Sequence, residues 1–254
     1  MKKKGEKISA LTAYEALFAG FLDESDIDFI LVGDSAGMVF AGHETTVPVT
    51  MENMIYHTRS VRRSVKNALL VADMPFMSYQ VSVEDALKNA GRLLKEGGAE
   101  AVKMEGGKRI LEQVKACVDA GIPVMGHLGM TPQSVNQFGG FKTQGKKIHE
   151  ALDLKKDALA LQATGVFAIV LEKIPASLAK EISEALDIPT IGIGAGPDTD
   201  GQILVTQDML GMYEKFKPKF VRQYAKLATE IKDAIRAYSE DVKRSNFPDE
   251  EESF

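Results

Sequence analysis

A single cysteine, Cys117, is present in the sequence, so no disulfide can form within the chain. This scarcity suits a reducing compartment, and we expect a cytoplasmic protein. The sequence also lacks any run near the roughly 18 apolar residues of a membrane span. Its basic start, residues 1–4, resembles the charged end of a signal peptide. However, Glu15 interrupts the apolar stretch that follows, and no small-residue cleavage pattern is obvious. We therefore expect neither export nor insertion into a membrane.

Positive charge is also in short supply, because 31 Lys and Arg residues face 36 Asp and Glu residues, a formal net charge of −5. A nucleic-acid partner requires clustered Lys and Arg, so we do not expect nucleic acid as the main partner. Nor do we expect a zinc site. The histidines, at positions 43, 57, 127 and 149, show no ligand spacing, and Cys117 falls within a predicted helix.

The chain shows no low-complexity linker and no shift in composition that would divide it. We therefore predict one domain over residues 1–254, with roughly residues 245–254 as an acidic C-terminal extension. Short apolar runs predict parallel strands buried on both faces, at residues 8–13, 29–32, 68–72, 101–104, 122–126, 167–171, 189–193 and 203–205. Amphipathic stretches predict helices at residues 14–24, 51–64, 83–96, 109–119, 151–163, 178–186 and 221–243.

This alternation predicts an α/β fold, a single closed (βα)8 TIM barrel, which suits a chain of 254 residues. A doubly wound open sheet is the alternative, and it calls for a glycine-rich turn after the first strand. The first strand instead ends in Leu11-Thr12-Ala13-Tyr14. The sequence therefore favours the barrel.

Ionisable residues stand at the ends of five predicted strands, where the active site of such a barrel lies. They are Asp34, Asp73, Lys103, Glu105, His127 and Glu172. Each has a structural alternative. An Asp after a strand can cap the next helix, and a strand-end His can be a hydrogen-bonded structural residue. Lys103 and Glu105 are two apart, so they share one face of a buried strand and can form an internal ion pair.

Taken together, these residues favour a magnesium site. Asp34 and Asp73, with Glu105 nearby, form an oxygen-rich group suited to a hard cation. A bound Mg²⁺ can chelate a 2-oxo acid and stabilise the enolate that forms when the neighbouring carbon loses a proton. Glu172, alone at the end of the sixth strand, is the natural general base, and Lys103 would offset negative charge on the substrate.

The segment Gly192-Ile193-Gly194-Ala195-Gly196 leaves two interpretations open. It lies in the seventh unit and lacks the spacing of a dinucleotide-binding fingerprint. Loops after strands seven and eight of a barrel often bind phosphate. The glycines can equally serve a close turn, which is the interpretation we favour.

At these residues the chain resembles the ketopantoate hydroxymethyltransferase family, which acts on 3-methyl-2-oxobutanoate in the pantothenate pathway. The likeness covers essentially the whole chain, in order. The matching segments are residues 11–14 (LTAY), 32–35 (VGDS), 42–50 (GHETTVPVT), 72–76 (ADMPF), 102–107 (VKMEGG), 126–134 (GHLGMTPQS), 139–142 (GGFK), 192–196 (GIGAG) and 200–202 (DGQ). Glu15, where we expect Asp, and the acidic tail depart from the family pattern only at the periphery.

The resemblance implies a TIM barrel with Mg²⁺ as cofactor and 5,10-methylenetetrahydrofolate as cosubstrate. It implies that Asp34, Asp73 and Glu105 bind the metal and that Glu172 is the proton acceptor. It implies that the oxo acid is bound by Asp34, Ser35, Asp73, Lys103 and His127. It also implies a homo-oligomer, typically a decamer.

The expected reaction transfers a hydroxymethyl group to 3-methyl-2-oxobutanoate through a Mg-stabilised enolate and gives 2-dehydropantoate. A Mg-dependent oxo-acid lyase or mutase on the same scaffold is the nearest alternative, and it would act without folate. A non-catalytic barrel that serves in assembly or binding is the other, and it predicts lost site residues. Asp34, Asp73, Lys103, Glu105 and Glu172 are all present, which favours an enzyme.

Overall fold

The computed structural model describes residues 1–214 and 217–254, and these form two compact units. The first unit is Met1–Val205, and the second is Thr206–Phe254. The second contains α9 (Thr206–Met209), α10 (Leu227–Lys243) and the predicted acidic extension, whose residues are exposed. The prediction of one domain over residues 1–254 stays a prediction. No helix in the described part of the chain is both long enough and apolar enough to cross a bilayer.

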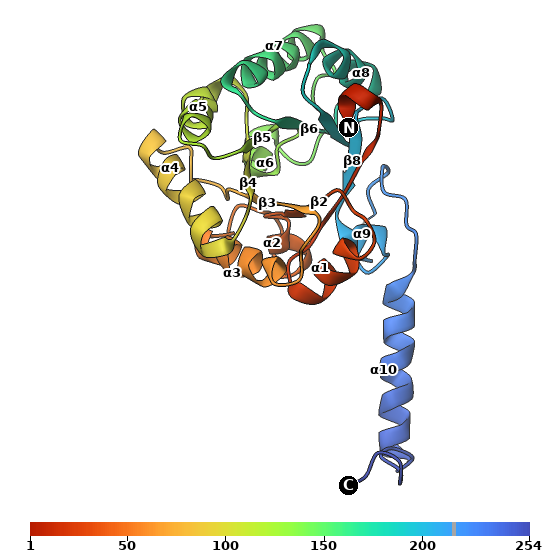
Figure 1. Ribbon diagram of the computed structural model, residues 1–254. Helices are drawn as coiled ribbons and strands as arrows, with labels where there is room; N and C mark the ends of the chain where they lie inside the picture. The colour runs from red at the N-terminus through yellow and green to blue at the C-terminus, as the bar shows by residue number, and fades with distance from the viewer. Residues whose placement is uncertain (215–216) are drawn as a thin grey trace. The chain divides into compact units, whose positions relative to one another are not determined.

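The first unit is a closed barrel of eight parallel strands that pair in sequence order, with β1 beside β8 (Figure 1). The strands are β1 (Ile8–Thr12), β2 (Phe29–Val32), β3 (Leu69–Asp73), β4 (Ala101–Glu105), β5 (Val124–Gly129), β6 (Ala168–Glu172), β7 (Thr190–Ile193) and β8 (Gly201–Leu204). The TIM-barrel prediction is confirmed, and the doubly wound alternative is wrong. Closure leaves no strand edge unpaired in this part of the chain.

The longer helices between the strands form a ring outside the barrel, whereas the two four-residue helices α2 and α6 do not lie in this ring (Figure 1). The α-helices are α1 (Ala16–Asp23), α2 (Ala36–Val39), α3 (Met51–Arg62), α4 (Val83–Arg92), α5 (Leu111–Asp119), α6 (Val135–Phe138), α7 (Ile148–Thr164) and α8 (Ala176–Ala185). Short helical turns are η1 (Lys2–Lys4), η2 (Leu93–Gly97), η3 (Lys108–Ile110) and η4 (Pro132–Ser134).

Local hydrogen bonds explain where several helices begin. Thr50 and Asn53 form a capping box at the start of α3, and Ser82 caps α4 by accepting from Asp85 N. The carboxylate of Glu15 accepts from the amides of the first turn of α1. The departure from the family pattern at this position therefore retains an N-cap.

Strand alternation separates two hydrophobic cores. Outward-facing strand residues pack against the helices in one large cluster. Inward-facing residues fill the barrel in a second cluster, made of Ala10, Phe29, Leu31, Val71, Ala101, Met125, Ala168, Val170, Ile191 and Ile203. The inner cluster packs inside the barrel and forms a floor beneath the carboxyl ends of the strands.

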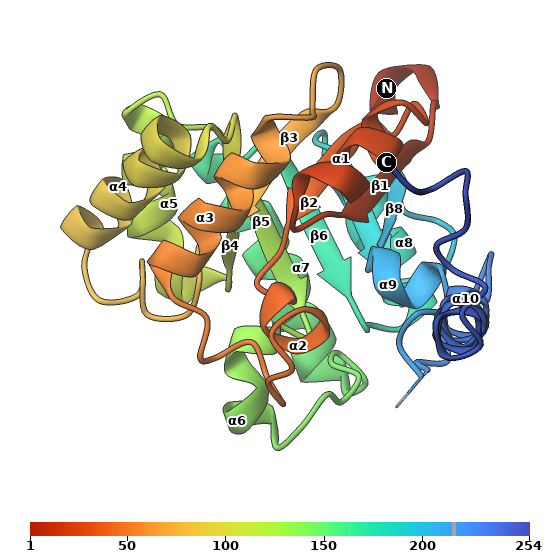
Figure 2. The ribbon, with the colours of Figure 1, turned by 90° about the horizontal axis from the view of Figure 1, so that it is seen from below.

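The two ends of the barrel differ in what covers them. Figure 2 shows α2 and α6 at one end, which is the carboxyl end because each follows a strand closely in sequence. The turn η1 lies at the opposite end, where Lys2 Nζ is 2.8 Å from Asp200 Oδ2. The carboxyl end therefore carries the short helices that surround the predicted site.

Two predicted boundaries shift for tertiary reasons. Strand β5 continues to Gly129 instead of ending at 126, because His127 pairs with Glu105 and Gly129 pairs with Glu172 in the barrel ladder. Helix α10 begins at Leu227 instead of 221, because the amides of Tyr224 and Leu227 donate to backbone carbonyls at positions 209 and 210. Long-range pairing decides both boundaries, and local sequence pattern does not record it.

Candidate active site

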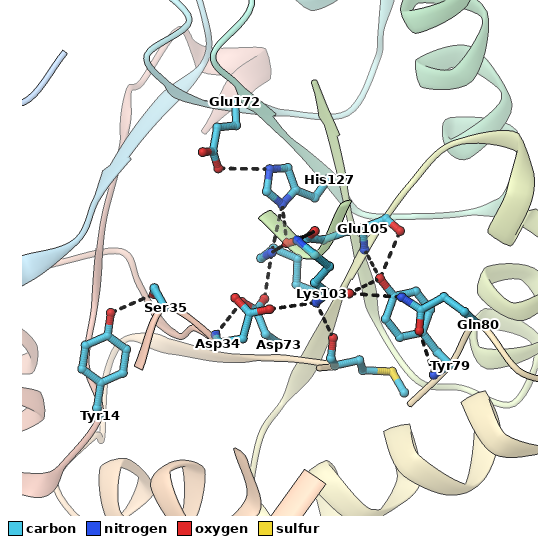
Figure 3. A network of polar contacts seen from close by, with 12 residues as sticks. Tyr14, Asp34, Ser35, Asp73, Tyr79, Gln80, Lys103, Glu105, His127 and Glu172 are labelled. Atoms are coloured by element: carbon cyan, nitrogen blue, oxygen red, sulfur yellow. Dashed lines mark hydrogen bonds and ion pairs between the residues drawn. The ribbon is translucent and has the colours of Figure 1, made fainter. Parts of the chain in front are cut away.

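Strand parity brings the predicted site residues together above the apolar floor. In β4, Ala101 faces the barrel interior, so Lys103 and Glu105 face the same way. Val71, Met125 and Val170 also face the interior. The residues two positions further on, Asp73 of β3, His127 of β5 and Glu172 of β6, therefore point inward as well. Five ionisable side chains from four strands thus share one layer, drawn in Figure 3.

Lys103 is the centre of this layer (Figure 3). Its Nζ lies 2.8 Å from Asp73 Oδ1, 3.1 Å from His127 Nδ1 and 3.8 Å from Glu105 Oε1. The internal ion pair between Lys103 and Glu105 is therefore present, but Asp73 is the nearer partner. One ammonium group joins three strands of the barrel.

His127 is held as a neutral imidazole. Burial lowers its pKa, and the positive charge of Lys103 lowers it further, outweighing the opposite effect of Glu172. Lys103 can only donate to Nδ1, so the ring proton is on Nε2. That nitrogen lies 3.4 Å from Glu172 Oε2. His127 therefore directs a donor toward the carboxylate of Glu172.

Glu172 is the most accessible member of the layer. Its side chain is 14% exposed, against 3–4% for Asp73, Lys103, Glu105 and His127. Its backbone is fixed by Met130 N, which donates to Glu172 O at 2.8 Å. Gly129 makes this approach possible, since a Cβ there would lie 2.2 Å from that same oxygen and its φ is +95°.

The two aspartates lie side by side, and neither caps a helix. Asp34 N donates to Asp73 Oδ2 at 3.0 Å. The N-cap of α2 is Ser35 and that of α4 is Ser82, so the helix-cap alternative is wrong for both aspartates. Ser35 Oγ lies 2.8 Å from the Tyr14 hydroxyl, next to this pair (Figure 3).

Together with the neighbouring Asp34, the layer carries more buried negative charge than Lys103 can neutralise. Burial raises the pKa of Asp34 well above its usual range, and repulsion from Asp73 and Glu105 adds to this. Burial also raises the pKa values of Asp73 and Glu105, although Lys103 opposes the shift in both. Burial by itself lowers the pKa of Lys103, but these three carboxylates together raise it, so it stays charged.

A divalent cation fits this surplus of negative charge. Glu105 Oε1 is buried and accepts no hydrogen bond from the described residues, so it is available to a cation. Within residues 1–214 and 217–254, no three His, Cys, Asp or Glu side chains converge as a complete metal site. Mg²⁺ needs only one or two carboxylates, with water and substrate completing its shell. The metal roles of Asp34, Asp73 and Glu105 stay predictions.

Comparison with known proteins decides the family. The model of the ketopantoate hydroxymethyltransferase family matches residues 1–250. The chain belongs to this family. It is 57% identical over 254 residues to 3-methyl-2-oxobutanoate hydroxymethyltransferase of Syntrophus aciditrophicus, covering 100% of this chain and 93% of the relative. It is 58% identical over 253 residues to the protein of that name from Thermoanaerobacter pseudethanolicus, covering 100% of this chain and 92% of that one.

Membership of the ketopantoate hydroxymethyltransferase family makes the chain an enzyme of the transferase class. The predicted family and the prediction of an enzyme are therefore confirmed, and the non-catalytic alternative is wrong. Solved structures show the same fold at low identity. A 2,3-dimethylmalate lyase of the PEP mutase/isocitrate lyase superfamily has a TM-score of 0.63 at 16% identity, covering 99% of this chain and 88% of its own. A phosphonopyruvate hydrolase complex with oxalate and Mg²⁺ has a TM-score of 0.63 at 12% identity, covering 96% and 84%.

Three residues of this ketopantoate hydroxymethyltransferase site were not predicted from sequence. Gln133 is 4% exposed and donates from Nε2 to Asp34 Oδ2 at 2.9 Å. Tyr79 and Gln80 in turn bind Gln133 Oε1. Tyr79 and Gln80 lie in a loop and Gln133 lies in η4, all beyond the strand ends, so strand parity does not indicate them. The sequence offered a clue only for Gln133, which lies in the segment 126–134 that matches the family.

The glycine-rich segment behaves as a close turn. Gly196 has a φ of +82°, and a Cβ there would lie 2.4 Å from the Cβ of Ala176. Gln202 Nε2 donates to Gly196 O at 2.9 Å, which ties the turn to β8. These contacts favour the packing interpretation over the phosphate interpretation.

Proposed function

We propose that the chain transfers a hydroxymethyl group from 5,10-methylenetetrahydrofolate to 3-methyl-2-oxobutanoate and gives 2-dehydropantoate for pantothenate and coenzyme A biosynthesis. The observation that carries the proposal is the partly exposed carboxylate of Glu172 close to the buried side chains of Asp34, Asp73, Glu105 and Lys103. Relatives at 57–58% identity over nearly their whole length are named for this activity on 3-methyl-2-oxobutanoate, which supports it.

Mg²⁺ is the proposed cofactor, held by Asp34, Asp73 and Glu105. The support is the buried surplus of negative charge and the oxygen Glu105 Oε1, which accepts no hydrogen bond from the described residues. When bound, Mg²⁺ would polarise the keto group of the oxo acid and so make the neighbouring C–H more acidic.

The oxo acid is proposed to bind over Lys103, beside Asp34, Ser35, Asp73 and His127. The Lys103 ammonium is buried and charged, so it offsets the substrate carboxylate in a region of low dielectric. Ser35 stands next to Asp34 and shares a short hydrogen bond with Tyr14, which fixes its hydroxyl at the edge of the site.

Glu172 is proposed to remove the proton from the branched carbon of the oxo acid. His127 Nε2–H faces its carboxylate at 3.4 Å and can hold it in place. The C–H electrons then form a C–C bond to the methylene carbon carried by the folate. Water supplies the hydroxyl group, and tetrahydrofolate leaves. Both carbon–nitrogen bonds of the methylene bridge break, and the proton taken by Glu172 and the second hydrogen of the water go to the two nitrogens of tetrahydrofolate.

Glu172→Gln tests this assignment. Without the base, deuterium exchange at the branched carbon of 3-methyl-2-oxobutanoate in D₂O with Mg²⁺ should slow by about 10²–10⁴-fold. The exchange is followed by proton NMR. Glu184→Gln, at an exposed position of α8, is the matched control and should exchange as the wild type does.

Fast exchange by Glu172→Gln would remove Glu172 from the proton-acceptor role. The folate requirement is tested separately, with wild-type protein supplied with oxo acid and Mg²⁺ but no folate. Exchange without product is expected. Cleavage or rearrangement of the acid under these conditions would instead favour the lyase or mutase alternative.

We further propose that the protein acts in the cytoplasm as a homo-oligomer, typically a decamer, with the oxo acid and folate as its partners and without nucleic acid or membrane. The resemblance supports the assembly. So does α10, in which no residue is buried and Ile231, Ile235, Tyr238 and Val242 are exposed at helical spacing. Sedimentation velocity of the purified chain tests the assembly, and a monomer at micromolar concentration would contradict it.

A further inference from the structure

We propose that Gln133 is a positioning residue that orients Asp34 and Glu105 toward the cation. The proposal rests on the magnesium site of the proposed function. Gln133 lies in η4, in the turn after β5, and it touches both carboxylates at once. Its backbone N donates to Glu105 Oε2 at 3.0 Å, and its side-chain Nε2 donates to Asp34 Oδ2 at 2.9 Å.

The orientation of the Gln133 amide is fixed by its other partners. Nε2 also donates to Met74 O at 2.9 Å. Oε1 accepts from the Tyr79 hydroxyl at 2.8 Å and from Gln80 Nε2 at 3.1 Å. Both amide donors and the carbonyl oxygen are thus engaged, and a flipped amide would place its oxygen against the carbonyl oxygen of Met74, which can only accept. The NH₂ group therefore faces Asp34.

Tyr79 connects this amide to the backbone of β4. Its hydroxyl accepts from Glu105 N at 2.9 Å while it binds Gln133 Oε1, and its side chain is fully buried. Figure 3 shows Tyr79 and Gln80 on the side of Glu105 away from Glu172. The network therefore supports the carboxylates from behind, on the side opposite the proposed base.

These contacts select one oxygen of each carboxylate. Gln133 occupies Asp34 Oδ2 and Glu105 Oε2, and it touches neither Asp34 Oδ1 nor Glu105 Oε1. Glu105 Oε1 instead lies on the side of Lys103 and His127, at 3.8 and 3.5 Å from their nitrogens. One oxygen of each carboxylate is thus held in the protein, and the other is left for a cation.

The neutrality of the amide matters as much as its geometry. A Lys or Arg at position 133 would also donate to Asp34, but its charge would cancel the negative charge that attracts a cation. An amide donor fixes the carboxylate and leaves that charge in place. Residues behind metal ligands commonly act in this way, and losing one weakens metal binding about 10–100-fold.

Gln133→Met tests the proposal, because it keeps the side-chain length and removes both amide donors and the acceptor. Mn²⁺ is the probe, and binding is measured from the EPR signal of the free ion. We expect Mn²⁺ affinity to fall about 10–100-fold. The Mg²⁺ concentration that gives half-maximal deuterium exchange should rise by a similar factor, while the rate at saturating Mg²⁺ changes less.

Gln162→Met is the matched control. Gln162 Oε1 accepts from the amides of Asp187 and Ile188, away from the site, so this variant loses structural hydrogen bonds of a similar kind. Its thermal stability should fall while its Mn²⁺ affinity stays that of the wild type. A merely structural role for Gln133 predicts the same result for Gln133→Met and would overturn the proposal.

Tyr79→Phe keeps the proposal testable if Gln133→Met does not fold. It removes only the hydroxyl that binds Gln133 Oε1 and Glu105 N, and it should weaken Mn²⁺ binding several-fold. Wild-type affinity in Tyr79→Phe, or in a folded Gln133→Met, overturns the positioning role and leaves the proposed function standing. Failure of the wild type itself to bind Mn²⁺ overturns the magnesium site and the positioning role together.

Discussion

Asp23 and Asp34 are both buried aspartates, but their surroundings shift the two pKa values in opposite directions. Asp23 ends α1 and accepts hydrogen bonds from the amides of Lys66, Asn67 and Ala68 at 2.8–3.0 Å. Burial by itself raises its pKa, but these donors outweigh burial and lower it. Asp23 is therefore a satisfied carboxylate that joins α1 to the segment before β3.

Asp34 shows the opposite balance. Its carboxylate receives the amide of Gln133, while Asp73 and Glu105 add negative charge nearby. Burial and repulsion together keep its pKa high. Burial alone therefore does not make a carboxylate functional. A carboxylate with many backbone donors holds the fold together, and one with few donors among like charges favours a cation.

Asp34→Asn should have the largest effect on activity. It removes a charge proposed to hold Mg²⁺, so kcat/KM for 2-dehydropantoate formation should fall on the order of 10³-fold. In EDTA its free energy of unfolding at pH 7 should equal or exceed that of the wild type. The reason is that the folded-state pKa of Asp34 is raised above 3.8, so ionisation above that pH costs the folded state.

Activity assays and urea titrations in EDTA measure the two quantities. A metal-free Asp34→Asn variant that is clearly less stable than the wild type would break the comparison, because it would make Asp34 a structural carboxylate like Asp23.

Asp23→Asn should have the reverse effect. An amide facing the donors of Lys66, Asn67 and Ala68 leaves some of them unsatisfied, which should lower the free energy of unfolding by about 1–3 kcal/mol. The folded variant should keep the kcat of the wild type, since Asp23 lies outside the site. Urea titration and a steady-state assay of the same preparation measure both.

The pH dependence of the stability lost in Asp23→Asn gives a sharper test. The folded-state pKa of Asp23 lies below its ordinary value of 3.8. Its stabilising contribution is therefore complete above that value and is lost as the pH falls through the lower, folded-state pKa. The stability gap between wild type and Asp23→Asn should be constant near neutral pH and should narrow below about pH 4. A gap that widens there would contradict the assignment.

Lys2→Met should have the smallest effect. It removes the ammonium 2.8 Å from Asp200, a carboxylate with lowered pKa that Thr190 N also binds at 2.8 Å. Because this pair is partly exposed and the Thr190 contact remains, the loss of stability should be about 1 kcal/mol or less. Activity should not change. Thermal unfolding monitored by circular dichroism measures the shift, and a loss as large as that of Asp23→Asn would contradict this ranking.

Strand parity explains why most of the site was predictable. The carboxyl ends of parallel strands meet at one rim, so ionisable residues at the ends of buried runs must gather there. Asp73, Lys103, Glu105, His127 and Glu172 all follow this rule. Asp34 lies just beyond β2 and was found by the same argument.

The supporting residues were not predictable in this way. Tyr79 lies in a loop and Gln133 in the three-residue turn η4, and segments this irregular or short show no periodicity that relates sequence position to direction. The structural role of Asp23 depends on amides more than forty positions away in the chain. The local pattern places Asp23 in a helix, but it does not show which donors its carboxylate meets.

The sequence by itself determined the barrel, the order of its strands and the set of charged residues at their carboxyl ends, because these follow from the alternation of apolar runs and from the two-residue period of a strand. Only the tertiary structure decided which carboxylates are satisfied and which are left with surplus charge. That difference depends on the hydrogen-bond donors that distant segments bring to each carboxylate, and such donors are set by packing and not by neighbours in the chain.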